Sequence, residues 1–536
     1  MKKIIPFLIL LILPLVLIFI SIYLKYSIGE YYLYRDPSYV YLFNSLNLSQ
    51  LSGYGVGHID HPGSSLQMAG AVVLKVCYLL QGRSGDIAQD VLHRPEFYLE
   101  RINIVIVLLI AAALYILGYV IFKKTGNIFN ALFLQITPLC SATIYFDLIN
   151  FSPEIFLILT SLVLITVLFK YAAEAESSAP DNFKYSIIFG LICGFGLATK
   201  ISFFPILVIP FILLKRIPNK LYFLLASFTA FILFVSPVIS FDQILYFAAW
   251  IKSIVTHTGL YGQGSEEIVI ASSFAGNIKK IFFNEPVFTI VYILMLVTIV
   301  IRFSPKHKNQ LKENIYNDLL TGIFIAMNIQ LIIVAKHFTF RYMTPALMFS
   351  VPAIYTVYRL TENMLPEYVR KKKTVLISVV FLIFIFFSAK YYQNTTSTLY
   401  YKQTESHKIE EYIDKNFEQS IVIGTNISSY KEAAYFQATR HSGTQREKYF
   451  AEIQKMFPGR YCFNIWSRNM ELTDKNIFKT ELIKAGKFIF YCKRENDVND
   501  FSNFLKNELI IKEAKYERVY SNGRDETVYE FIIAEQ

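Results

Sequence analysis

The sequence predicts an all-α polytopic membrane domain, followed by a small soluble α/β domain at the C-terminal end. Of the 536 residues, 54% are hydrophobic and only 17% are charged, whereas soluble domains carry about 25% charged residues. Apolar runs near the ~20 residues that cross a bilayer recur as far as residue 390. Beyond residue 390, shorter helix-like and strand-like segments alternate.

The first apolar run follows Met1-Lys2-Lys3 and covers residues 4–24. It is longer than the roughly 7–15 apolar residues of a signal peptide, and no small-residue cleavage site follows it. We therefore interpret it as an uncleaved transmembrane helix. Further candidates bring the total to about eleven helices. They cover residues 103–122, 127–146, 151–170, 185–198, 200–214, 219–241, 284–302, 317–335, 341–360 and 373–390.

Positive charges predict the orientation, because Lys and Arg gather in the cytoplasmic loops of membrane proteins. The charged segments are Lys2-Lys3, Lys123-Lys124, Lys215-Arg216, residues 302–312 and residues 370–373. These segments lie on one side of the membrane only under two conditions. Residues 185–214 must cross the membrane twice, as two short helices rather than one long helix. Residues 66–80 must not cross it. The N-terminus is then cytoplasmic and the C-terminus external. The net charge of +11 is attributed to these loops and not to nucleic-acid binding.

This orientation divides the chain into a transmembrane domain, residues 1–390, and an external domain, residues 391–536. Large external loops are predicted at residues 25–102 and 242–283. Within the first loop, segments 39–51 and 66–80 could lie along the interface as amphipathic helices. The abundance of Ile, Lys, Asn and Phe suggests an AT-rich bacterium. The predicted location is the bacterial inner membrane, with the C-terminal domain periplasmic or extracellular.

The soluble tail alternates two kinds of segment, which is typical of a small α/β domain. Helices are predicted at residues 407–417, 429–440, 445–457, 474–485 and 496–508, and strands at 420–425, 461–466, 487–491, 509–521 and 527–534. The tail has no Gly-x-Gly-x-x-Gly or P-loop pattern, so nothing marks it as nucleotide-binding. Five cysteines are too few for a disulfide scaffold. Cys462 and Cys492 could pair in an oxidising compartment or remain free.

The first external loop holds a candidate catalytic base, Asp36, about a dozen positions after the first helix. A carboxylate just outside the bilayer can be partly desolvated, and burial raises its pKa toward that of a useful base. The alternative is that Asp36 caps a helix that begins at Pro37. Tyr39, on that helix, is a candidate substrate contact.

His58, Asp60 and His61 lie further along the same loop and are candidate substrate-binding residues. They are also metal-ligand types, but His-x-Asp-His spacing fits no standard zinc pattern. Hydrogen bonds to a sugar, ordering of the loop and a divalent metal all stay open. No cofactor is predicted beyond that metal.

Asp147 is a second candidate catalytic acid, and Glu154 follows it just inside the next helix, after Pro153. A carboxylate at the centre of a bilayer costs roughly 2.5–3.5 kcal/mol, and a position at the outer edge reduces that cost. The alternative is that Asp147 simply ends a hydrophobic run.

Several cations fall on the predicted external side, where Lys and Arg should be scarce. They could snorkel to water or bind an anionic lipid phosphate. The second large loop adds a glycine-rich polar segment that could close over a ligand or form a turn. The candidate substrate-binding residues of these regions are Lys200, Lys336, His337, Arg341, Tyr342, His257 and Tyr261.

Together these residues resemble the GT-C glycosyltransferases, multi-spanning enzymes that use polyprenyl- or dolichyl-phosphate sugars. The protein O-mannosyltransferase and lipid A aminoarabinose transferase branch is the most similar. The resemblance covers residues 1–390 and rests on four features: Asp36 after the first helix, His61-Pro62-Gly63 in the long loop, the Gly-x-x-Thr-Lys pattern ending at Lys200, and Arg341-Tyr342. It implies that Asp36 is catalytic and that Lys200 and Arg341 bind the carrier phosphate. That branch often has an Asp-Glu pair in the first loop, whereas Pro37 follows Asp36 here, so the acceptor class stays open.

The implied reaction moves a hexosyl or pentosyl group, with inversion, from a polyprenyl-phosphate carrier to an acceptor hydroxyl on the periplasmic face. Asp36 would take the hydroxyl proton, and cations would stabilise the phosphate leaving group. The implied partners are the lipid-linked donor and a lipid-linked glycan, lipid or protein acceptor, without nucleic acid. The alternatives are a transporter or flippase for lipid-linked sugars and an O-antigen polymerase or ligase.

Overall fold

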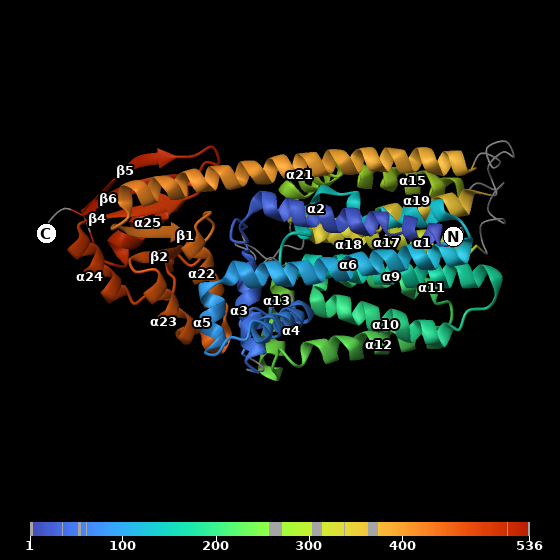
Figure 1. The fold of residues 1–536 in the computed structure, drawn as a ribbon, viewed down its shortest axis with the longest axis horizontal. Coiled ribbons are helices and arrows are strands. Elements are labelled where there is room, and N and C mark those ends of the chain that lie inside the picture. Colours follow the sequence, from blue (N-terminus) through green and yellow to red (C-terminus); the bar gives the residue numbers. More distant parts are fainter. Residues whose placement is uncertain are drawn as a thin grey trace. The chain divides into compact units, whose positions relative to one another are not determined.

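A computed structural model describes residues 4–34, 36–51, 55–60, 62–256, 271–302, 314–336, 338–362, 373–511 and 513–533. The chain forms two compact units. Unit 1 comprises Met1–Tyr23, Ile59–Leu66 and Asn103–Thr395. Unit 2 comprises Leu24–His58, Gln67–Ile102 and Thr396–Gln536. Unit 1 is helical, whereas unit 2 combines helices with a sheet (Figure 1).

The helices of unit 1, some of which continue into unit 2, come from most of the first 395 residues. They are α1 (Ile5–Ile9), α2 (Ile12–Ile28), α6 (Pro95–Thr125), α7 (Ile128–Gln135), η1 (Thr137–Leu139), α8 (Ala142–Asp147), α9 (Pro153–Ser177), α10 (Asn182–Thr199), η2 (Ile201–Leu207), α11 (Val208–Leu213), α12 (Ile217–Val235), α13 (Phe241–Thr256), α14 (Ala271–Asn284), α15 (Pro286–Arg302), α17 (Ile315–Lys336), η4 (Phe340–Met343), α18 (Thr344–Met348), α19 (Ser350–Thr361) and α21 (Lys373–Phe417).

The helices confirm a multi-pass membrane protein but not the count of eleven spans. Within the described residues, six helices are long and apolar enough to cross a bilayer. A seventh crossing results if α14 and α15, which meet at a bend of 104°, are taken as one span. Three predicted spans are broken instead, at residues 127–146, 200–214 and 341–360. Each break holds a proline in or beside a 3₁₀ turn, where the missing N–H prevents a regular helix.

Small residues allow α10 and α12 to pack closely within unit 1. Gly190 and Gly194 lie one turn apart on α10 and face α12. A Cβ atom on Gly190 would lie 2.5 Å from the Cβ of Ala226 and 2.7 Å from the carbonyl oxygen of Phe223. Such small residues let helix backbones approach inside a membrane, where apolar side chains alone give no drive to associate.

Unit 2 contains a six-stranded sheet with the order β3-β2-β1-β4-β6-β5. The strands are β1 (Ile421–Thr425), β2 (Arg460–Asn464), β3 (Asn469–Met470), β4 (Lys487–Cys492), β5 (Ala514–Ser521) and β6 (Thr527–Ile533). β2 and β4 lie parallel to β1 on its two sides, and the remaining neighbours pair antiparallel. The predicted α/β tail is therefore confirmed, with the short β3 as an addition.

The helices of the tail are α22 (Lys431–Arg440), η6 (Gly443–Gln445), α23 (Arg446–Met456), α24 (Lys475–Ala485) and α25 (Glu495–Asn507). An aromatic core joins α25 to the sheet, since the rings of Phe490 and Phe501 stack with centroids 4.3 Å apart. The helix predicted at 407–417 is the end of α21, which continues unbroken from Lys373 to Phe417 (Figure 1).

Cys462 and Cys492 are both free thiols, so the pairing considered for them is wrong for this structure. Cys462 lies on β2 and Cys492 at the end of β4, and β1 separates these two strands. Strands two apart are about 9–10 Å from each other, which exceeds the Cα separation of about 7 Å that a disulfide can bridge.

Part of the first external loop belongs to unit 2 and packs against the tail. The segments predicted at 39–51 and 66–80 are helical, as α3 (Ser38–Ser49) and α4 (Ser64–Leu80), and α5 (Ile87–His93) follows. The side-chain amide of Asn47 donates to the carbonyl of Ser442 at 2.5 Å, and the hydroxyl of Tyr449 donates to Asn47 at 2.7 Å. A Cβ atom on Gly57 would lie 2.5 Å from the backbone nitrogen of Gly443. The loop and the tail are thus one folded body.

Candidate active site

A buried ion cluster in unit 1 brings two of the predicted cations onto one carboxylate. Glu154 lies in the first turn of α9, after Pro153. Its Oε1 atom accepts a hydrogen bond from Nζ of Lys200, and Nε of Arg341 lies 3.6 Å from the same oxygen. Glu154 is fully buried and Lys200 is 2% exposed. Glu154 and Arg341, almost 200 positions apart in the sequence, therefore belong to the same ion cluster.

Lys200 is held by the break between α10 and η2. Its backbone is extended, with φ of −161° and ψ of 133°, and forms an antiparallel bridge with Pro62. The adjacent Gly63 N–H donates to the carbonyl of Thr199 at 3.2 Å, and the hydroxyls of Ser65 and Thr199 lie 2.5 Å apart. The Pro-Gly motif of the first loop thus fixes the end of the helix that carries Lys200.

Arg341 and Tyr342 lie in η4 and approach the same centre. Nζ of Lys200 lies 4.3 Å from the centroid of the Tyr342 ring, a cation–π distance. The Tyr342 carbonyl accepts a hydrogen bond of 2.6 Å from the side chain of Gln330. Arg341 keeps 27% of its side chain exposed, so it is the member of the cluster that a ligand can reach most directly.

Asp147, the last residue of α8, is the second acid of the cluster and is 5% exposed. Burial, and after it the charge of Glu154, raise the pKa of Asp147 well above its usual range. The hydroxyl of Thr344 lies 2.5 Å from Oδ2 of Asp147 and 2.8 Å from the carbonyl oxygen of Arg341. The carbonyl of Arg341 also accepts a hydrogen bond from the backbone N–H of Thr344.

The cluster is arranged to receive an anion. Lys200 and Arg341 both lie against the carboxylate of Glu154. The second carboxylate oxygen of Glu154, Oε2, is buried and has no hydrogen-bond partner among the described residues. Two cations gathered at a largely buried site can stabilise a phosphate group.

Asp36 and His58 lie in unit 2. Asp36 is half-buried, on a bend before α3, and its charge acts on His441. The rings of His58 and His441 are 5.2 Å apart, as are those of His58 and Tyr41. Burial, with the nearby His58 and Arg440, lowers the pKa of His441 to about 3, although the charge of Asp36 opposes this. His441 is therefore neutral at pH 7. No motif in the sequence singles it out as a site residue.

Tyr39 is fully buried in unit 2, where its hydroxyl donates to Glu96 at 2.7 Å. Asp60 belongs to unit 1. Burial raises the pKa of Tyr246, and the charge of Asp60 adds to this shift. Nζ of Lys336 donates to the carbonyl of Val255. Four predicted site residues lie outside the described residues: His61, His257, Tyr261 and His337.

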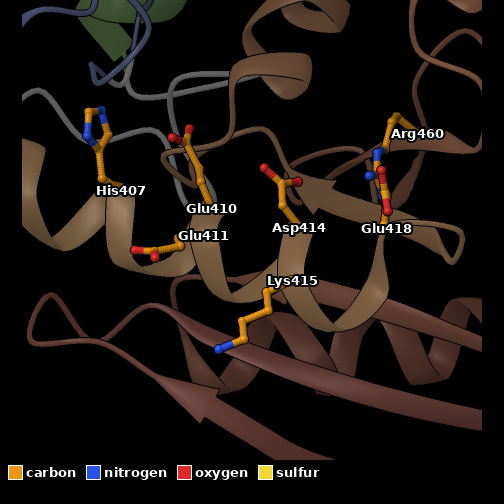
Figure 2. A pocket seen from close by; sticks show the side chains of 7 residues that line it. All are labelled: His407, Glu410, Glu411, Asp414, Lys415, Glu418 and Arg460. Carbon is orange, nitrogen blue, oxygen red and sulfur yellow. The ribbon is translucent and has the colours of Figure 1, made fainter.

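Within the described residues, no group of three or more His, Cys, Asp or Glu side chains could hold a metal ion. An open depression lined largely by acidic residues lies along the end of α21 in unit 2 (Figure 2). Its open volume of about 910 Å³ is lined by His407, Glu410, Glu411, Asp414, Lys415, Glu418 and Arg460. Glu410 accepts a hydrogen bond of 2.9 Å from the Tyr32 hydroxyl, and burial raises its pKa to about 7.

Comparison with known families gives a match at residues 87–241, to the family described as dolichyl-phosphate-mannose-protein mannosyltransferase. The matched segment contains Asp147, Glu154 and Lys200. This match confirms the predicted resemblance to GT-C glycosyltransferases over that part of the chain.

Two solved structures of ArnT from Cupriavidus metallidurans also match. The apo structure has a TM-score of 0.46 at 8% identity, over 92% of this chain and 93% of that chain. The structure bound to undecaprenyl phosphate has a TM-score of 0.44 at 10% identity, over 96% and 97%. A comparison with curated protein sequences finds no match.

Proposed function

We propose that this chain is an inner-membrane glycosyltransferase that takes a sugar from a polyprenyl-phosphate carrier. The observation that carries the proposal is the convergence of Lys200 and Arg341 on the buried Glu154. The family match over residues 87–241 supports it, because Asp147, Glu154 and Lys200 fall inside that segment.

In the proposed reaction, an acceptor hydroxyl attacks the anomeric carbon of the donor sugar from the face opposite the phosphate. The hydroxyl proton passes to the carboxylate of Asp36, the bond between the anomeric carbon and the phosphate oxygen breaks, and the configuration inverts. Lys200 and Arg341 stabilise the charge on the departing phosphate, so no general acid is required. Asp147, the second acid of the cluster, is a further candidate catalytic residue in this proposal.

The site is proposed to face the periplasm. The first loop and the tail fold together in unit 2, so both lie on one side of the membrane. The positive charges of the predicted cytoplasmic loops favour the opposite side, the periplasm, for unit 2. Since nucleotide sugars are cytoplasmic, the donor there must be carried by a lipid.

The test uses the purified full chain with a polyprenyl-phosphate sugar and measures the release of polyprenyl phosphate. Lys200→Gln and Arg341→Gln should raise KM for the donor, because each removes a phosphate ligand. Asp36→Asn should lower kcat about 10²-fold or more with little change in KM. Lys215→Gln serves as the matched control, since Lys215 is largely exposed and pairs with Asp318 at 3.1 Å.

If Asp36→Asn keeps full activity, the assignment of the base is wrong. If Lys200→Gln and Arg341→Gln bind the donor as tightly as Lys215→Gln does, the phosphate site is wrong. Movement of lipid-linked sugar across vesicles without release of carrier phosphate would instead identify a transporter.

A further inference from the structure

The sheet of unit 2 has a topological switch point. From β1 the chain passes to β2 on one side, and from β2 it passes to β4 on the other side of β1. α22 and α23 make the first connection and α24 makes the second. In open α/β sheets, ligands bind outside the carboxyl ends of the strands at such a point, where the two connections leave a crevice.

A cavity of about 280 Å³ lies at this position and is lined by residues that follow three parallel strands. Ser429 follows β1, Trp466 follows β2, and Lys493 follows β4. Arg524, from the turn between β5 and β6, and Tyr34, from the first loop, complete the wall. All of these residues belong to unit 2.

Arg524 is the anchor of the cavity. Its Nη1 atom donates to the hydroxyls of Ser406 and Ser429, at 2.7 Å each, which fixes the plane of the guanidinium group. Across the described part of the chain, its Nε and Nη2 atoms have no protein acceptor. A guanidinium group with two such donors matches the oxygens of a phosphate or carboxylate.

The surroundings of Arg524 are positively charged. Burial, and then repulsion from Arg524 and Lys493, lower the pKa of Lys402 to about 8. Arg494 also lines the cavity, although Asp497 pairs with it at 3.0 Å. Cations that repel one another persist in a fold more readily when an anion neutralises them.

Two carboxylates near Arg524, those of Glu526 and Glu405, have partners of their own. Glu526 accepts hydrogen bonds from the backbone of Ser429 at 3.0 Å and from Asn522 at 3.1 Å. Glu405 pairs with Lys408 at 2.5 Å and accepts from the backbone of Gly523. Neither carboxylate makes a hydrogen bond or an ion pair with Arg524 among the described residues.

We propose that this cavity binds a phosphomonoester carried on a group of monosaccharide size. The open donors of Arg524 and the charge of Lys493 would hold the phosphate, and the rings of Trp466 and Tyr34 would offer apolar faces to a sugar. The volume is just below the range of drug-sized sites, about 300–1,000 Å³, and suits one sugar ring with its phosphate. We assign this phosphorylated group to the acceptor, and that assignment rests on the proposed function. The binding of the group in this cavity does not depend on the proposed function.

The chain contains two tryptophans, so Trp466 can report on its own cavity. In a full-length Trp250→Phe background, glucose 6-phosphate should change the fluorescence of Trp466 with saturation, and more tightly than inorganic phosphate does. Glucose alone should have no effect. Arg524→Lys keeps the positive charge but removes the paired N–H donors of the guanidinium group. This variant and Lys493→Gln should each weaken the binding of glucose 6-phosphate about tenfold or more.

The matched control is Lys475→Gln, which removes a cation paired with Glu508 at 2.8 Å on the surface. It should leave the affinity unchanged, and thermal unfolding checks that every variant is folded. A response that Arg524→Lys and Lys493→Gln leave unaltered overturns the proposal, as does no response to glucose 6-phosphate. A response to short-chain phosphatidic acid alone also overturns it, because the ligand would then be a lipid headgroup.

Lys200→Gln separates this inference from the proposed function. It should reduce sugar transfer while the Trp466 response to glucose 6-phosphate stays intact, because Lys200 belongs to unit 1. A loss of that response in Lys200→Gln would contradict an independent site in the tail.

Discussion

At the scale of single residues, the buried cluster depends on charge balance. Glu154 is the only carboxylate in contact with both Lys200 and Arg341 among the described residues. A buried ion pair is costly to form, but removal of one partner leaves an uncompensated charge, which costs about 3–5 kcal/mol. Glu154 therefore holds the site together when no phosphate is present.

Glu154→Gln should lower the thermal stability of the purified chain, because the buried Lys200 and the partly exposed Arg341 then lose the carboxylate that contacts both. Polyprenyl phosphate should restore the stability and should stabilise this variant more than it stabilises the wild type. Thermal unfolding with and without the lipid measures both effects. Glu176→Gln is the control, since Glu176 is 40% exposed in its pair with Arg359. Equal stabilisation of the two variants by the lipid would contradict a phosphate site at Glu154.

Glu410 gives a pH dependence of stability, because burial raises its pKa from 4.5 to about 7. The folded chain then binds more protons than the unfolded chain between these values, so stability falls as pH rises from about 4.5 to 7. The effect is on the order of 1–2 kcal/mol after solvent screening.

Glu410→Gln should raise the melting temperature at pH 8 and change it little near pH 4.5. The amide can still accept the hydrogen bond from Tyr32. Thermal unfolding from pH 4.5 to 8 tests this, with Glu411→Gln as the neighbouring control. An identical pH dependence in the wild type and in Glu410→Gln would show that another group is responsible.

The sequence located part of the site and not the rest, for a physical reason. Lys200 and Arg341 were recognisable because cations on the predicted external side are unexpected there. Glu154 was noticed but received no role, because a carboxylate in the first turn of a helix is common at an N-terminus. Only the tertiary structure shows that it faces both cations.

At the scale of elements, close helix packing fixes α10, whose last turn leads to Lys200. Gly190 and Gly194 contact α12 at distances that leave no room for a Cβ atom. The sequence predicted both helices from their apolar length. It did not predict their pairing, because glycine spacing does not identify a partner helix.

Gly190→Leu should destabilise the chain by about 2 kcal/mol or more, because the neighbouring atoms include backbone, which cannot rotate away. Thermal unfolding in detergent measures the loss. Leu191→Val is the control, since Leu191 is the next residue and is 46% exposed. A stability equal to that of the control would mean that α10 and α12 separate without cost.

Prolines explain why three of the predicted spans are not continuous helices. Pro138 lies in η1, Pro205 in η2, and Pro345 at the start of α18. Each interrupts a run that is apolar enough to predict a continuous helix. The length of an apolar segment predicts whether it can cross the lipid bilayer. The continuity of a helix depends instead on backbone hydrogen bonds, which proline cannot donate.

At the scale of the whole molecule, the first loop and the tail form one folded unit. Asp86 pairs with Lys448 at 2.8 Å and His93 with Glu452 at 3.2 Å, which adds to the bonds of Asn47. The predicted orientation places both segments outside, and the number of crossings between them must then be even. That orientation stays a prediction.

Cysteines at exposed positions test this orientation in a Cys77→Ser background. Ser84→Cys, in the first loop, and Lys484→Cys, in the tail, should both react with a membrane-impermeant maleimide in intact cells. Ser178→Cys, in a predicted cytoplasmic loop, should react only after permeabilisation. Reaction of Ser84→Cys and Lys484→Cys from opposite sides would contradict the fold of unit 2. Reaction of both only after permeabilisation would reverse the orientation and remove the basis for a lipid-carried donor.

The contact between Asn47 and Ser442 joins positions 395 residues apart. At a synthesis rate of about 5–20 residues per second, the ribosome needs roughly 20–80 s to travel from one to the other. During this interval the buried face of α3 has been translated while its partner surface does not yet exist. Biogenesis of this chain therefore requires that the buried face of α3 be shielded until the last quarter of the polypeptide arrives.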